Sequence, residues 1–146
     1  MQPTTDQTVS TLNSFLRGEI SAVETYRQAL DKVTEQPIRS TLQDCLESHQ
    51  RRVSLISSRI RNLGGKPSTE SGVWGVFAKA VEGGAKMLGA KPAVAALEQG
   101  EDHGRDDYRR DIDQLDGESR RLIEMQVLPE QERTHRALSQ LKHTLQ

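Results

Sequence analysis

The chain has 146 residues, of which 34% are hydrophobic and 28% charged, and its net charge is -1. That length suits one domain with a core that needs no disulfide or structural metal, and it is too short for two cores. The balanced charge argues against a nucleic-acid-binding module, which would normally carry a concentrated basic face.

The N-terminus and the cysteine content bear on cellular location. Residues 1–10 are polar and lack the basic start and apolar stretch of a secretory signal. No apolar run approaches the roughly 18 residues needed to span a bilayer. The single cysteine, Cys45, cannot form an intramolecular disulfide, which suits a reducing compartment. We therefore expect a cytoplasmic protein that binds neither membranes nor nucleic acids.

The first half of the chain is predicted to form a pair of helices, over residues 6–35 and 38–63. Apolar residues recur at steps of three and four, the spacing that places side chains on one helix face. In the first helix these are Val9, Leu12, Leu16, Ile20, Val23, Tyr26, Leu30 and Val33; in the second they are Leu42, Cys45, Leu46, Val53, Ile56, Ile60 and Leu63. Pro37 suits the start of the second helix, and Gly64-Gly65 suits its end. The connection is so short that the two helices must be antiparallel.

Residues 64–92 are predicted to form a long connection. Five more glycines follow Gly64-Gly65 within it, and residues 73–82 have the pattern of a short amphipathic helix lying across the bundle. Trp74 and Phe77 lie on its apolar face. We expect these two aromatics to cover the core; the alternative is an apolar patch that binds a protein partner or a second copy of the chain.

The second half of the chain predicts another pair of helices, over residues 93–116 and 118–145. The apolar stripe passes through Val94, Leu97, Tyr108, Ile112 and Leu115, and then through Leu122, Ile123, Val127, Leu138, Leu141 and Leu145. Asp116 is a candidate N-cap between them. Pro129 removes the hydrogen bond to the carbonyl of Met125, so we expect a kink or two abutting segments there.

Two helical hairpins joined by one long connection define the predicted fold class. It is an all-α antiparallel four-helix bundle, ferritin-like in connectivity, because a crossover between the second and third helices distinguishes that fold from a simple up-and-down bundle. No segment has the pattern of a strand.

The chain also resembles a bacterial family of uncharacterised ferritin-like four-helix proteins, known mainly as a domain of unknown function. The resemblance covers nearly the whole chain and rests on residues 12–16 with Gly18-Glu19, residues 59–67, residues 97–102 with Tyr108, and Gln126 with His135. It implies the ferritin-like fold and no particular activity.

Ferritin-like proteins that hold two metal ions suggest a test for a metal centre. In them a Glu from each of two helices joins a Glu-x-x-His pair from each of the other two. Glu132 and His135 form such a pair on the fourth predicted helix, whereas the residue three before His49 is Leu46, so the second pair fails. Glu19, His49 and Glu101 fall on buried stripes of the other helices. These five residues are the candidate metal ligands.

Two interpretations of these polar residues stay open. In the first, Glu19 bonds His49, and Glu101 bonds His135 or Tyr108, so that the residues satisfy one another and set the helix register without a cofactor. In the second, they bind iron or manganese, as one ion or two. The first predicts a non-enzymatic structural or interaction protein, and the second a degenerate di-metal carboxylate protein with oxidase, peroxidase or iron-handling activity.

Other chemistry has weaker support in the sequence. Cys45 and His49 share a helix face, but a thiol predicted to be buried is a poor nucleophile. The arginine pairs at 51–52, 109–110 and 120–121 lie near acidic residues and are interpreted as solvated helix surface.

Overall fold

The structure is a computed structural model that describes residues 3–71 and 90–145. Within these ranges it is helical and contains no strand, which confirms the predicted all-α class. Its four long helices are α1 (Thr5–Lys32), α2 (Gln36–Asn62), α4 (Ala90–Asp111) and α6 (Leu128–Thr144). Between α4 and α6 lie a 3-10 turn (Ile112–Gln114), the short helix α5 (Gly117–Leu122) and a π-helical turn (Ile123–Val127). The predicted helix at 73–82, with Trp74 and Phe77, falls outside the described residues.

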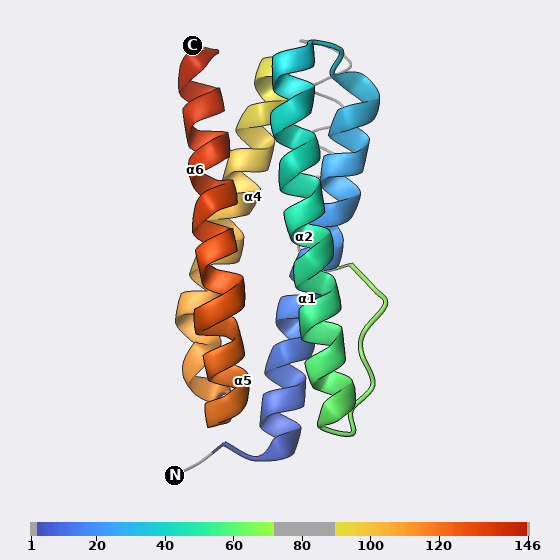
Figure 1. Ribbon diagram of the computed structural model, residues 1–146, viewed down its shortest axis with the longest axis vertical. Helices are drawn as coiled ribbons and strands as arrows, with labels where there is room; N and C mark the ends of the chain where they lie inside the picture. The colour runs from blue at the N-terminus through green and yellow to red at the C-terminus, as the bar shows by residue number, and fades with distance from the viewer. Residues whose placement is uncertain (1–2, 72–89, 146) are drawn as a thin grey trace.

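The four long helices lie side by side along the long axis of the molecule (Figure 1). α1 packs against α2 and α4, and α6 packs against the same two helices from the other side. In the view of Figure 1, α1 and α6 run upward while α2 and α4 run downward. Helices that pack together therefore run in opposite directions, and the ends of α2 and α4 that the chain must connect lie at opposite ends of the molecule.

The described start of that connection runs back along α1. Gly65 lies against Val9. The Asn13 side chain donates to the carbonyl of Lys66 and accepts from the backbone of Ser68. These contacts turn the chain away from the end of α2 and lead it back along the bundle.

The sequence signals for helix ends have the expected local structure. Pro37 lies in the first turn of α2, where its missing N–H is least needed. Gly64, with φ +82°, follows the end of α2 in the left-handed conformation that glycine adopts without steric cost. The side chain of Asp116 accepts from the backbone of Ser119, 2.7 Å away, and caps α5. The observed boundaries differ from the predicted ones by a few residues: α1 ends at Lys32, and α4 begins at Ala90 and tightens into the 3-10 turn after Asp111.

Pro129 divides the last predicted helix into segments. The π-helical turn Ile123–Val127 ends just before it, and the N–H of Leu128 bonds to the carbonyl of Ile123, five residues back. α6 then begins with the proline in its first turn. The wider turn places the proline where its missing N–H costs least, so the chain passes from one helical segment to the next.

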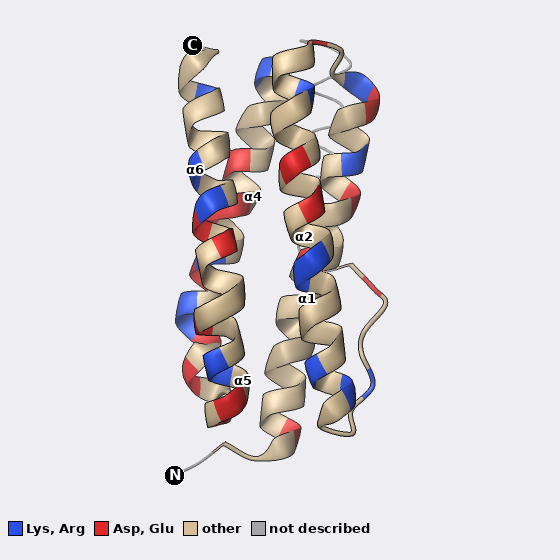
Figure 2. Cartoon of the chain, in the orientation of Figure 1, with Lys and Arg blue, Asp and Glu red and all other residues tan. Residues whose placement is uncertain are grey.

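The buried apolar residues form two clusters along the bundle. One contains Val23, Tyr26, Leu42, Leu46, Ala93, Leu97 and Leu138; the other contains Leu12, Leu16, Ile56, Ile60, Ile112, Ile123 and Val127. Buried polar side chains lie between these positions on every long helix. Both acidic and basic residues lie on the visible outer faces of α2 and α6 (Figure 2).

Among the described helices, none has a stretch long and apolar enough to cross a membrane.

Candidate functional site

A layer of polar side chains divides the core halfway along the bundle. All four long helices contribute to it. We call it the central layer, and its members are Glu19, His49, Arg52, Glu101, Gln131 and Thr134, each at most 4% exposed. Each member is three or four residues along the chain from a buried apolar residue, so the stripes that build the core also carry these polar groups inward.

His49 bridges the two carboxylates of the layer. Its Nδ1 lies 2.5 Å from Glu19 Oε1, and its Nε2 lies 2.8 Å from Glu101 Oε2. A neutral imidazole carries one N–H and would present a lone pair to one of the carboxylates. Both contacts are hydrogen bonds when the ring is protonated, so the geometry indicates an imidazolium that donates to α1 on one side and α4 on the other.

Arg52 supplies the second positive charge. Its Nη1 donates to Gln131 Oε1 at 2.8 Å and reaches Glu19 Oε2 at 3.4 Å. Its Nη2 donates to Ser48, to the Glu130 carbonyl and to Thr134. Two carboxylates therefore face one imidazolium and one guanidinium, and the layer is neutral as a whole.

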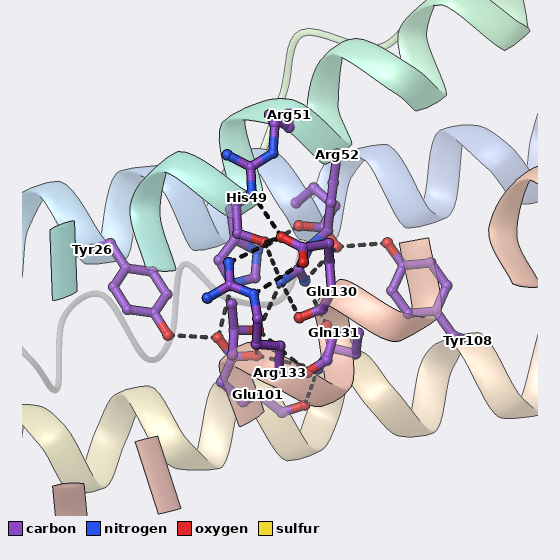
Figure 3. A network of polar contacts seen from close by, with 12 residues as sticks. Tyr26, His49, Arg51, Arg52, Glu101, Tyr108, Glu130, Gln131 and Arg133 are labelled. Atoms are coloured by element: carbon purple, nitrogen blue, oxygen red, sulfur yellow. Dashed lines mark hydrogen bonds and ion pairs between the residues drawn. The ribbon is translucent and has the colours of Figure 1, made fainter. Parts of the chain in front are cut away.

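Two tyrosines complete the carboxylate shells from opposite sides (Figure 3). The Tyr26 hydroxyl donates to Glu101 Oε2 at 2.5 Å, and the Tyr108 hydroxyl donates to Glu19 Oε2 at 2.6 Å. Burial, reinforced by the adjacent carboxylate, raises the pKa of each tyrosine well above its usual value, so both remain proton donors. Thr134 Oγ1 and Gln131 Nε2 donate to the other oxygen of Glu101, at 2.8 and 3.2 Å.

The pKa values follow from this balance of burial and charge. Burial alone would raise the pKa of Glu19, but Arg52 and His49 outweigh it and lower the pKa to about 2. The pKa of Glu101 is also lowered, because His49 and Arg52 outweigh burial there. Burial and Arg52 act to lower the pKa of His49, but Glu101 and Glu19 prevail and raise it. All three shifts favour the charged forms of these groups.

The layer has little room for a substrate. A void of about 10 Å³ between Gly18 and Gly104 lies against Glu19, His49 and Tyr108. That volume suits one water molecule and no organic ligand. Cys45 nearby is buried, and burial together with Glu101 raises the pKa of its thiol to about 12. A neutral buried thiol is not a nucleophile, in agreement with its predicted core role.

The structure brings together three of the five candidate ligands, Glu19, His49 and Glu101. It also corrects the expected pairing: Tyr108 bonds Glu19 and not Glu101, and Glu101 bonds His49 and not His135.

Glu132 and His135, the other two candidates, do not reach the central layer. Glu132 is exposed, and His135 is 21% exposed and bonds Asp102. The inward positions of α6 are Gln131 and Thr134, one residue earlier. Steps of four from Ile123 through Val127 lead to Gln131, whereas the Glu-x-x-His template selects positions rotated by about 100°. One more step of four along the apolar stripe points to Gln131, whereas the spacing to Leu138 fits both Thr134 and His135.

Arg52 is the main residue that the sequence analysis assigned wrongly. The prediction of solvated surface is correct for Arg51, which is 58% exposed, and wrong for Arg52, which is fully buried. Its position offered a signal, because Arg52 lies three residues after His49 and four before Ile56 on the buried stripe of α2.

A second group of carboxylates and a histidine lies between α4 and α6. Glu98, Asp102 and His135, which we call the rim cluster, each offer one ligand atom within 4.8 Å of the others. Protein groups also contact them: Lys142 lies 3.6 Å from Glu98, and Arg105 lies 3.5 Å from Asp102. Among the described residues, the rim cluster is a second place where a cation could bind.

Comparison with known proteins gives a family and no activity. A model described as "Domain of unknown function (DUF2383)" matches residues 7–114. No curated protein and no solved structure matches the chain.

Proposed function

Because the chain belongs to the DUF2383 family, which carries no assigned activity, we propose a function from the central layer: a ferritin-like four-helix bundle stabilised by its own charges, acting as a non-enzymatic structural or interaction protein. The ferritin-like assignment is supported by the helix directions in Figure 1 and by the glutamates that α1 and α4 contribute to the middle of the bundle.

The observation that carries this proposal is the burial of Arg52 beside His49. In a di-metal bundle, positive charge comes from the ions, and Glu-x-x-His pairs from two helices help to hold them. Here α2 has His49 and Arg52 at that spacing, and α6 has Gln131 and Thr134. The guanidinium and the imidazolium supply the charge that the two carboxylates require.

The same residues do not fit an iron or manganese pair. Both ring nitrogens of His49 contact carboxylates, so neither is free to coordinate an ion. Arg52 reaches Glu19 and would repel an ion placed there. An amide and a hydroxyl on α6 are also poorer ligands than a carboxylate and an imidazole.

Metal analysis of untagged protein, purified without chelator, tests the proposal. We expect substoichiometric iron and manganese, and no change on Glu101→Gln. Asp102→Asn serves as the comparison, since it alters the rim cluster and leaves the central layer intact. Stoichiometric iron or manganese that is lost in Glu101→Gln and kept in Asp102→Asn would overturn the proposal, provided that circular dichroism shows both variants folded.

That outcome would favour the alternative of a degenerate di-metal carboxylate protein with oxidase, peroxidase or iron-handling activity. The observation in its favour is that Glu19 and Glu101, from α1 and α4, both approach His49 in the core.

Location and partners complete the proposal. We propose a cytoplasmic location, supported by the single cysteine, which cannot form an intramolecular disulfide. Association with a second copy or a protein partner through Trp74 and Phe77 is proposed from the sequence pattern alone. Sedimentation of wild-type protein and a Trp74→Ala/Phe77→Ala variant would test it, and an identical, concentration-independent monomer in both samples would count against a homodimer.

A further inference from the structure

A hollow of about 310 Å³ lies between α4 and α6, on the outside of the bundle. We call it the α4/α6 hollow. It is lined by Arg105, Arg109, Glu132, His135, Arg136 and Ser139. Three guanidinium groups and one carboxylate line it, so positive charge is in excess among the lining side chains. Arg105 also lies 3.5 Å from Asp102 and 3.6 Å from Asp106, two carboxylates beside the hollow.

Two of the three arginines have no partner among the described residues. Arg109 and Arg136 are exposed, and the structure gives neither of them a hydrogen bond or ion pair within residues 3–71 and 90–145. Elsewhere on the surface the guanidinium of Arg133 binds Asp44 and Glu130, and that of Arg110 binds Asp107 and Asp111. The hollow therefore has cationic donors that no carboxylate of the described chain neutralises.

The third arginine leaves a buried donor unused. Nε of Arg105 is buried and has no hydrogen-bond partner, the nearest carboxylate oxygen being that of Asp106 at 3.6 Å. A buried N–H without a partner costs free energy, which a ligand oxygen or a water molecule would recover. This donor belongs to the same side chain that lines the hollow.

We propose that the α4/α6 hollow binds a phosphate monoester. The planar guanidinium fork matches the oxygens of a phosphate, and two such forks can share a dianion. His135 and Ser139 line the hollow from α6, but His135 Nε2 contacts Asp102 and the Ser139 hydroxyl donates to Glu98, so the donors available to a ligand are those of the arginines. The volume is at the lower end of small-molecule sites, which suits a phosphate with a small organic group.

Titration of labelled wild-type protein with inorganic phosphate and with phenyl phosphate, followed by NMR at constant ionic strength, tests the site. We expect saturable shifts at the residues that line the hollow, with phenyl phosphate at least as tight as phosphate. The double variant Arg109→Gln/Arg136→Gln should weaken binding by at least about tenfold, because each lost contact is a charge-assisted hydrogen bond.

The matched control is Arg61→Gln/Arg121→Gln, which removes the same charge from two exposed arginines outside the hollow. It should leave the dissociation constant unchanged. Glu132→Gln should tighten binding, since it removes the one carboxylate that lines the hollow. Equal weakening in the two arginine double variants would mean that only overall charge matters, and that result, like non-saturable shifts in the wild type, would overturn the proposal. None of these variants alters the central layer, so this test is independent of the metal analysis.

Discussion

The central layer and the rim cluster contain the same types of residue and differ in their surroundings. Each has two carboxylates and one histidine. In the central layer these are Glu19, Glu101 and His49; in the rim cluster they are Glu98, Asp102 and His135. The first set is almost fully buried, whereas the side chains of the second are 16% to 41% exposed.

Burial decides what each set needs. A buried carboxylate cannot be stabilised by water, so Glu19 and Glu101 require an imidazolium, a guanidinium and two tyrosine hydroxyls. Water screens the charges of the rim cluster. Arg105, 3.5 Å from Asp102, and Lys142, 3.6 Å from Glu98, add weaker ion pairs. Two carboxylates and a histidine can therefore form an internally neutral layer where they are buried and a solvent-screened surface group where they are partly exposed.

The largest difference between the two regions should come from removing an arginine. Arg52→Met leaves Glu19 and Glu101 with one cation between them, and we expect a loss of about 3–5 kcal/mol in the free energy of unfolding. Arg105→Met, at the rim, should cost at most about 1 kcal/mol, because its ion pairs are screened. Urea denaturation of both variants measures the two costs. Comparable losses would show that burial does not separate the regions.

The pH dependence of stability should identify His49. Its pKa is raised in the folded protein, so its contribution is complete below the ordinary value of 6.5 and is lost as the pH rises through the higher folded value. The free energy of unfolding of the wild type should therefore fall as the pH rises above 6.5. His49→Gln should be less stable than the wild type at pH 6, and its free energy of unfolding should depend much less on pH above 6.5. Denaturant midpoints between pH 6 and 9 measure this; a steep alkaline limb in His49→Gln would contradict the assignment.

The pH dependence of stability below pH 4.5 should identify the contribution of Glu19. Its pKa is lowered from 4.5 to about 2, so its stabilising contribution is present above 4.5 and is lost as the pH falls toward 2. Glu19→Gln should reduce the dependence of the unfolding free energy on pH in this window. Glu98→Gln should leave the dependence unchanged, because Glu19 is intact. Unfolding followed by circular dichroism at pH 5, 4 and 3 provides the comparison, and matching profiles for the wild type and Glu19→Gln would rule out this role.

The smallest difference should come from single hydroxyl groups. Tyr108→Phe removes one donor from buried Glu19, and we expect a loss of about 1–3 kcal/mol. Ser139→Ala removes a 3.2 Å bond to Glu98 at the rim and should stay within about 0.5 kcal/mol of the wild type. Thermal unfolding resolves such a gap. Should the serine variant prove the more costly of the two, the rim cluster would be more rigid than its exposure indicates.

Local features of the fold follow directly from the amino-acid sequence. Apolar spacing identified the long helices, Pro37, Gly64 and Asp116 marked helix ends, and Pro129 marked the division before α6. The stripes also predicted that Glu19 and His49 would be buried. These features depend on residues within a few turns of one another, so periodicity and backbone chemistry are sufficient to find them.

Which polar residues contact one another in the core depends on how the four helices pack together. His135 and Thr134 are three and four residues before Leu138, so both spacings fit a helix face, and packing against α4 and α2 selected Thr134. Arg52 could have extended into solvent as Arg51 does, but acceptors from α1 and α6 surround its inward position. A buried charge is stable only where other helices supply its partners, and their alignment follows from the packing of all four helices together.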